Sequence, residues 1–150
     1  MSNNFSIFSI GKVKIDGENF IIQLDKKYVK GLKELDGFSH INVYWWCHFF
    51  DKDEYRSLIE CNKPYKNAPD VIGVFATRSP VRPNLIAASI VNILKIDYEK
   101  CEIYVPYIDA EDGTPIIDIK PYHPATDRVK DVKVPNWCNH WPKWYEDNAT

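Results

Sequence analysis

Short runs of β-branched and aromatic residues, separated by turn-forming residues, recur along most of this chain. Runs with this spacing predict strands. The expected strands are residues 5–14, 19–24, 38–50, 71–76, 86–96, 101–107 and 116–119. An Asp16-Gly17 turn joins the first two into a hairpin. The pattern therefore predicts an all-β barrel or sandwich.

Helical patterns are few. Residues 26–35 place apolar side chains at helical spacing, which predicts one short amphipathic helix. Residues 51–70 are charged and loop-like, and the chain beyond Tyr122 is polar and is expected to be irregular. Strands and helices do not alternate, and no glycine-rich loop follows the first strand. These observations exclude a Rossmann-type dinucleotide domain.

The chain has 150 residues, enough for one domain with a core that needs no disulfide or metal. It carries 19 Lys and Arg against 21 Asp and Glu, and this net charge of −2 lowers the expectation of a nucleic-acid partner. No segment is long and apolar enough to span a bilayer, and the first residues lack a signal-peptide pattern. We therefore expect a cytoplasmic protein without membrane contact, whose four cysteines are free thiols.

The segment 73–84, GVFATRSPVRPN, combines two arginines with two prolines. The prolines stiffen the loop and hold Arg78 and Arg82 on a fixed support. Paired guanidinium groups suit a carboxylate or a phosphate, because each can bind such a group with two parallel hydrogen bonds. An ordinary surface loop with two solvated arginines explains the same residues equally well.

The segment 109–122 gathers Asp109, Glu111, Asp112 and Asp118. Such carboxylates could bind Mg²⁺, act as a general base, or attract a sulfonium and a ribose. The alternative is an exposed turn, because Asp-Gly pairs are frequent in turns and carboxylates are rarely buried.

Histidines and cysteines do not form a convincing metal site. His40 and His48 fall on one face of the expected strand but would lie about 26 Å apart along a straight strand. Cys138 and His140 supply two ligands where a tetrahedral site needs four. No metal is expected, and the tryptophans of the same segment are expected to hold the C-terminus against the barrel or a partner subunit.

Three segments together resemble the TsaA-like family, whose characterised members are tRNA N6-threonylcarbamoyladenosine methyltransferases. They are residues 35–50 (LDGFSHINVYWWCHFF), 73–94 (GVFATRSPVRPN followed by a strand) and 112–122 (DGTPIIDIKPY). They occur in the family's order and, with their connections, cover about residues 5–127.

The resemblance implies an all-β fold, a small single-sheet β-barrel with one or two short helices. It implies one TsaA-like domain over residues 1–150, with an irregular, Trp-rich tail over 128–150. It also implies S-adenosyl-L-methionine as the cofactor, a homodimer, and methyl transfer to N6 of threonylcarbamoyladenosine beside the anticodon of a tRNA.

Carried over by motif position, the site comprises two sets of residues, and no catalytic residue or base is assigned. Tyr44, Trp45 and Trp46 offer an aromatic face for the sulfonium. The cofactor-binding residues are Cys47, His48, Arg78, Ile86, Asp109, Ala110, Glu111 and Asp112, and the substrate-binding residues are Arg82 and Asn84.

Two alternatives stay open: methyl transfer to a small molecule, and a non-catalytic module that binds S-adenosyl-L-methionine. In the family the first strand runs into a segment that contains arginine and proline, whereas here residues 10–14 lead directly to the Asp16-Gly17 turn. Fewer positive charges weaken contacts to phosphate, which favours the small-molecule acceptor.

Overall fold

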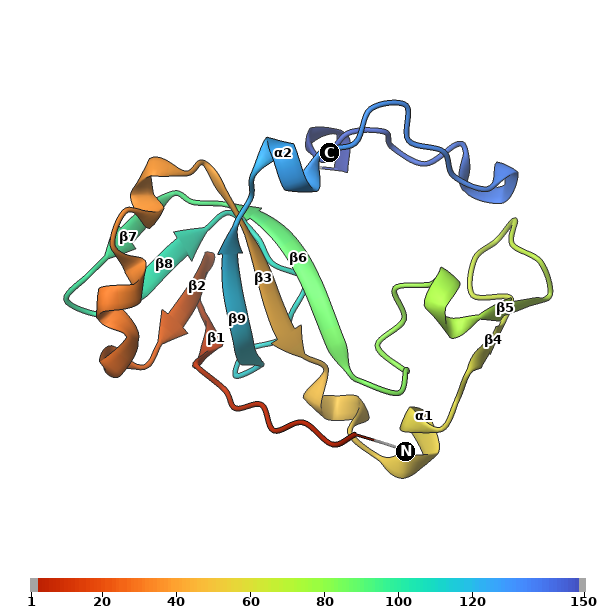
Figure 1. Ribbon diagram of the computed structural model, residues 1–150, viewed down its shortest axis with the longest axis horizontal. Helices are drawn as coiled ribbons and strands as arrows, with labels where there is room; N and C mark the ends of the chain where they lie inside the picture. The colour runs from red at the N-terminus through yellow and green to blue at the C-terminus, as the bar shows by residue number, and fades with distance from the viewer. Residues whose placement is uncertain (1–2, 149–150) are drawn as a thin grey trace.

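A seven-stranded antiparallel sheet dominates the computed structural model, which describes residues 3–148 (Figure 1). The strand order is β6-β3-β9-β1-β2-β8-β7, and β4 and β5 form a separate two-stranded ladder. The strands are β1 (Gly11–Asp16), β2 (Asn19–Leu24), β3 (His40–Trp46), β4 (Glu60–Asn62), β5 (Val71–Gly73), β6 (Ile86–Asn92), β7 (Lys95–Asp97), β8 (Glu102–Val105) and β9 (Pro115–Pro121).

Helical segments are short. The α-helices are α1 (Asp53–Arg56) and α2 (Pro124–Asp127). The 3₁₀ helices are Lys26–Leu32, Leu35–Gly37, His48–Phe50, Val74–Ala76, Asn136–Cys138 and Glu146–Asn148. No helix among residues 3–148 is long and apolar enough to cross a membrane.

The core lies on one face of this sheet. Alternate residues of the strands point to that face, so β-branched side chains from six strands meet there. The fully or nearly fully buried members from the strands are Val13, Ile22, Leu24, Ile41, Val43, Val91, Ile103, Val105 and Ile116. The mostly-β fold and the antiparallel sheet are confirmed. No ladder in the described part of the chain joins the edge strands β6 and β7, so closure into a barrel stays a prediction.

The first hairpin has the predicted turn. Asp16 pairs with Asn19, and Gly17 adopts a φ of 60°, a conformation that glycine tolerates without strain. Its first strand begins at Gly11, six residues later than expected.

Other expected boundaries were wrong. Two 3₁₀ segments, Lys26–Leu32 and Leu35–Gly37, replace the one amphipathic helix expected over residues 26–35. The first ends where Lys33 becomes extended (ψ 131°), and Glu34, with a positive φ of 67°, precedes the second. The expected strand 38–50 ends at Trp46, so His48 lies in a 3₁₀ turn and not on the strand with His40. Residues 51–70 contain α1 and β4, where a loop was expected.

Residues 51–84 form an excursion from the sheet, here called the arm, which contains α1 and the β4–β5 ladder. The arm stands away from the sheet in Figure 1, and the C-terminal tail reaches over to it. Arg56 holds the base of the arm, since its Nε donates to the Pro83 carbonyl (3.0 Å) and its Nη1 pairs with Asp51 (3.2 Å). The arm therefore leaves and re-enters the sheet beside the same point, between β3 and β6.

A buried carboxylate joins β1, β2 and β8. Glu102 is only 2% exposed, and it accepts hydrogen bonds from Gln23 Nε2 (2.8 Å), Tyr104 Oη (3.0 Å) and Lys14 Nζ (3.5 Å). Burial alone would raise the pKa of Glu102, but the hydrogen bonds and the Lys14 charge together hold that pKa below its usual value.

This network predicts a pH-dependent stability. Since the pKa of Glu102 is lowered by folding, its carboxylate stabilises the native state above the unfolded pKa, and the stabilisation is lost as pH falls through the folded pKa. The free energy of unfolding, measured with urea between about pH 5 and pH 3, should fall more steeply in the wild type than in Glu102→Gln. Glu18→Gln, an exposed carboxylate, is the control and should behave as wild type. Parallel curves for wild type and Glu102→Gln would contradict this assignment.

Candidate functional site

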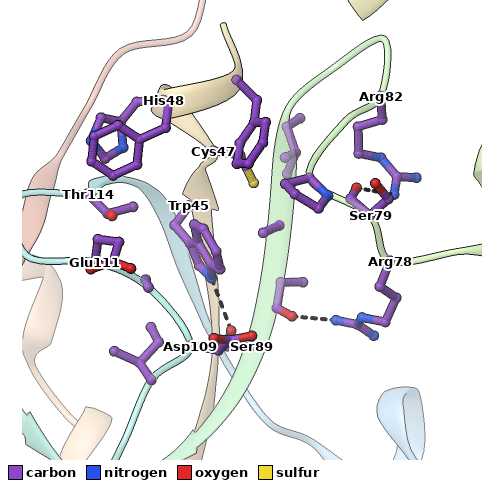
Figure 2. A pocket seen from close by; sticks show the side chains of 18 of the residues that line it. Trp45, Cys47, His48, Arg78, Ser79, Arg82, Ser89, Asp109, Glu111 and Thr114 are labelled. Atoms are coloured by element: carbon purple, nitrogen blue, oxygen red, sulfur yellow. Dashed lines mark hydrogen bonds between the residues drawn. The ribbon is translucent and has the colours of Figure 1, made fainter. Parts of the chain in front are cut away.

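A pocket of about 690 Å³ opens where the hydrophobic core ends. Ile15, Phe20, Trp45 and Ala110 pack against the core and also line the pocket, so its floor is an extension of the core. Its volume lies within the range of small-molecule sites. Figure 2 shows His48, Glu111 and Thr114 on one side of it and Arg78 and Arg82 on the other.

The β3–β6 ladder positions the middle of the site. The two strands pair from His40 with Asn92 to Trp46 with Ile86, and the Cys47 N–H then donates to the Leu85 carbonyl (2.8 Å). A register shift against β9 occurs between Tyr44 and Trp45, at the point where the strand reaches the pocket. β-Bulges of this kind redirect side chains next to functional sites.

Trp45 and Ser89 meet in the pocket across this ladder. The indole Nε1 of Trp45 donates to Ser89 Oγ (3.0 Å; Figure 2). Because this hydrogen bond satisfies the one polar atom of the indole, the ring is fixed in orientation and presents an aromatic surface to the pocket.

The Thr77–Arg82 loop forms one wall and is held by its own side chains. The buried Thr77 hydroxyl donates to the Val74 carbonyl (2.8 Å) and accepts from the Ser79 N–H (3.2 Å). Arg82 Nη1 donates to the carbonyls of Thr77 (3.2 Å) and Ser79 (3.3 Å). Arg82 therefore braces the loop from within, a use of this guanidinium that the sequence did not indicate.

Arg78 differs from Arg82 in its surroundings. Its side chain is exposed, and its Nη2 donates to the Ala88 carbonyl of β6. A guanidinium has five N–H donors, so this single contact orients Arg78 and leaves donors for an anionic group in the pocket.

The opposite wall is acidic. Asp109, Ala110 and Glu111 line the pocket, and Tyr107 Oη donates to Asp109 Oδ1 (3.3 Å). Partial burial raises the pKa of Tyr107, and the negative charges of Asp109 and Glu111 raise it further. The phenol therefore stays protonated and keeps Asp109 in place as an acceptor.

Cys47 lies between the two walls and is 5% exposed. Burial raises the pKa of its thiol, the Arg82 charge opposes that effect and Asp109 adds to it. The result is a neutral thiol at physiological pH, which contributes shape and polarisability rather than a nucleophile.

The structure brings most of the predicted site residues together. Those that line the pocket are Cys47, His48, Arg78, Arg82, Ile86, Asp109, Ala110 and Glu111. Asp112 and Asn84 are not among its lining residues. Asp112 Oδ1 accepts the Ile15 N–H (2.8 Å) and so ties the acidic loop to β1, and the Asn84 carbonyl accepts the Ile86 N–H (2.8 Å). The binding roles assigned to all ten stay predictions.

Several lining residues escaped the sequence analysis. Phe20 was assigned only to a strand and Ile15 to none, and Ser89 and Thr114 lie within two of the family-like segments without having been singled out. Tyr107 could have been found from the sequence. It precedes the predicted site residue Asp109 by two positions, so the two side chains lie on the same side of an extended segment.

The described residues, 3–148, contain no group of three or more His, Cys, Asp and Glu side chains that could hold a metal ion. The polar groups of the pocket are two guanidiniums, two carboxylates, an imidazole and hydroxyls. This set suits an organic ligand that carries both positive and negative charges.

Comparisons with known proteins agree with this kind of site. The profile of the family described as the tRNA-methyltransferase O N-terminal domain matches residues 11–128. A protein of Archaeoglobus fulgidus named as an S-adenosyl-L-methionine-binding protein is 35% identical over 112 residues, which are 75% of this chain and 75% of that protein.

Solved structures show the same fold. A crystal structure of TrmO from Pseudomonas aeruginosa aligns with a TM-score of 0.66 and 25% identity, and the alignment covers 87% of this chain and 62% of that one. A second crystal structure of TrmO gives the same TM-score and identity over 88% of this chain and 64% of the other. This chain thus matches a little under two thirds of each of these solved chains.

The matching profile and the shared fold place the chain among methyltransferase domains. The chain belongs to the tRNA-methyltransferase O N-terminal domain family, which is the family that the three sequence segments resemble.

Proposed function

We propose that this protein transfers the methyl group of S-adenosyl-L-methionine to N6 of threonylcarbamoyladenosine beside the anticodon of a tRNA. The observation that carries the proposal is the pocket, which joins residues from three separate segments of the chain that resemble the family. The family description names a tRNA methyltransferase, and the Archaeoglobus relative is named for binding this cofactor.

The pocket offers complementary groups for each part of the cofactor. Arg78 can bind its carboxylate with charge-assisted hydrogen bonds. Asp109 and Glu111 can accept hydrogen bonds from ribose hydroxyls and from the ammonium group. The faces of Trp45 and Phe20 suit a sulfonium, which is attracted to aromatic rings. When bound, the cofactor supplies a methyl group activated by the positive sulfur.

The protein's own contribution is alignment and proton removal. The fixed walls of the pocket can hold the cofactor and the acceptor close together, so that methyl transfer takes place within one complex. Such alignment supplies much of the rate enhancement in reactions of two bound reactants. N6 of the modified adenosine is part of a urea-like group and is a weak nucleophile. The pocket side chains that can accept its proton are His48, Asp109 and Glu111.

Removal of Arg78 tests the cofactor site. Arg78→Ala should weaken S-adenosyl-L-methionine binding by roughly tenfold or more, because one charge-assisted hydrogen-bond donor is lost. Isothermal titration calorimetry gives the Kd, and the far-UV circular dichroism spectrum should stay unchanged. Arg128→Ala, an exposed arginine outside the pocket, is the matched control and should keep the wild-type Kd. Equal affinity in Arg78→Ala and wild type would contradict the assignment of the cofactor to this pocket.

A small-molecule acceptor is the second candidate, and the net charge of −2 favours it. An acidic surface repels phosphate backbones, and the strand β1 leads into a tight turn where the family has an arginine-containing segment. A third reading, a non-catalytic cofactor-binding module, predicts binding without turnover of any acceptor.

We also propose that the protein works as a homodimer, as the resemblance implies. Large apolar side chains beside the pocket are exposed, among them Phe49 (62%), Phe75 (80%) and Ile86 (43%). Burial of these side chains against a second copy would remove them from water. Sedimentation equilibrium should give a mass near 35 kDa, about twice that of one chain. A mass of one chain at the concentrations used in assays would contradict this proposal.

A further inference from the structure

The arm has little hydrophobic support of its own. Its buried apolar side chains are Ala68, Ile72 and Val74, and none of them belongs to the core cluster of the sheet. The β4–β5 ladder contains only three residue pairs. Since an isolated two-stranded ladder is marginally stable in water, the arm depends on contacts from another part of the chain.

The Trp-rich tail, residues 128–150 and described to residue 148, supplies such contacts at the turn between β4 and β5. Tyr65 of that turn stacks on Trp137 of the tail, with ring centroids 5.4 Å apart and 15° between the planes. Trp141 meets both rings edge-on, at 5.0 Å from Tyr65 and 5.7 Å from Trp137. Cys138, next to Trp137, is only 5% exposed. The three rings therefore join the tail to the tip of the arm.

The same part of the chain is also held to the sheet, at the beginning of β3. The ring of His40 contacts the rings of Tyr122 (6.4 Å), which follows β9, and of Tyr145 (5.7 Å), near the end of the tail. The Tyr122 N–H also donates to the His40 carbonyl (3.0 Å). The chain between these two tyrosines thus runs from the sheet to the arm and back, and Figure 1 shows the C-terminus returning to the side of α2.

Hydrogen bonds continue from the tip of the arm to the pocket. Beyond the β4–β5 ladder the Val74 N–H donates to the Ile59 carbonyl (2.9 Å), and the Thr77 N–H donates to the Val74 carbonyl (3.1 Å). Thr77 is the first residue of the Thr77–Arg82 loop, the arginine wall of the pocket. Because rigid hydrogen-bonded elements carry displacements between distant sites, a movement of the turn around Tyr65 also moves this wall.

We propose that the Trp-rich tail is a strap that holds the arm in place, and that Tyr65 and Trp137 are positioning residues for the arginine wall. The inference rests on the proposed function, in which Arg78 of that wall binds the cofactor. The family profile ends at residue 128, so the strap lies beyond the matched domain. When the stack is broken, a smaller fraction of molecules holds the wall in its binding position, and the apparent Kd rises in inverse proportion to that fraction.

Alkylation of Cys47 tests the strap without any ligand. Cys47 lies between the two walls of the pocket and is 5% exposed, so iodoacetamide reaches it only when a wall moves. Peptide mapping by mass spectrometry separates it from the other cysteines. In Tyr65→Ala and in Trp137→Ala, Cys47 should react about three- to tenfold faster than in wild type, the range expected for the loss of one aromatic pair.

The controls separate local loosening from a general loss of stability. Cys101, fully buried in the core cluster of the sheet, reports global unfolding in the same sample. Tyr65→Phe keeps the ring and should react as wild type. Tyr98→Ala removes a tyrosine ring just after β7, at the opposite edge of the sheet, and should also react as wild type. The double variant Tyr65→Ala/Trp137→Ala should match the faster single variant, because both substitutions break the same contact.

Calorimetry with S-adenosyl-L-methionine then connects the strap to binding. Tyr65→Ala and Trp137→Ala should each raise the Kd by about three- to tenfold, in step with the alkylation rate, because both quantities depend on the fraction of molecules with the wall in position. Tyr65→Phe and Tyr98→Ala should keep the wild-type Kd.

The outcomes distinguish the strap from the proposed function. Faster alkylation of Cys47 together with a raised Kd supports the strap. An unchanged alkylation rate in both alanine variants overturns it, as do additive rates in the double variant and a parallel rise at Cys47 and Cys101. Faster alkylation with a wild-type Kd overturns the positioning role. If the wild type binds no S-adenosyl-L-methionine while both alanine variants still expose Cys47, the proposed function fails and the strap is supported.

Discussion

Backbone pairing between β3 and β6 is the contact on which the site depends. The ladder joins residues that lie from 40 positions (Trp46 and Ile86) to 52 positions (His40 and Asn92) apart in the chain, and it continues past the strand end through Cys47 and Leu85. The chain leaves the sheet after β3 as the arm, and the last part of the arm, the Thr77–Arg82 loop, leads back to β6. A shift of one residue in this register would turn Trp45 and Ser89 to opposite faces and would separate the two walls of the pocket.

The walls themselves are opposite in charge and differ in how they are held. The arginine wall is braced by hydrogen bonds to its own carbonyls, and the acidic wall is tied to β1 by Asp112. Fixed dipoles and charges of this kind need no rearrangement when a ligand enters, which is the usual basis of tight binding in small sites. The floor between them is apolar because it is the end of the hydrophobic core. A ligand with a charged end and a flat, less polar part matches this arrangement.

The sequence predicted those features that local chemistry determines. The first hairpin follows from runs of apolar residues and an Asp-Gly turn, and the proline-rich turn around Arg78 lies, as expected, outside helices and strands. Long-range features were not predictable in the same way. Ser89 and Thr114 enter the pocket only because distant strands pair, and the end of β3 at Trp46 cannot be read from residues 47–50, which are as aromatic as the strand itself. The role of Arg82 as a brace depends on carbonyl positions that no sequence pattern reveals.

The most direct test of the central claim is methyl transfer from S-adenosyl-L-methionine carrying a labelled methyl group to threonine tRNA that holds threonylcarbamoyladenosine without the N6 methyl. The account predicts that the label appears at N6 of that nucleoside after digestion and mass spectrometry, and that tRNA lacking the threonylcarbamoyl group stays unlabelled. Binding of the cofactor with no label in the modified tRNA would contradict the account and would favour a small-molecule acceptor.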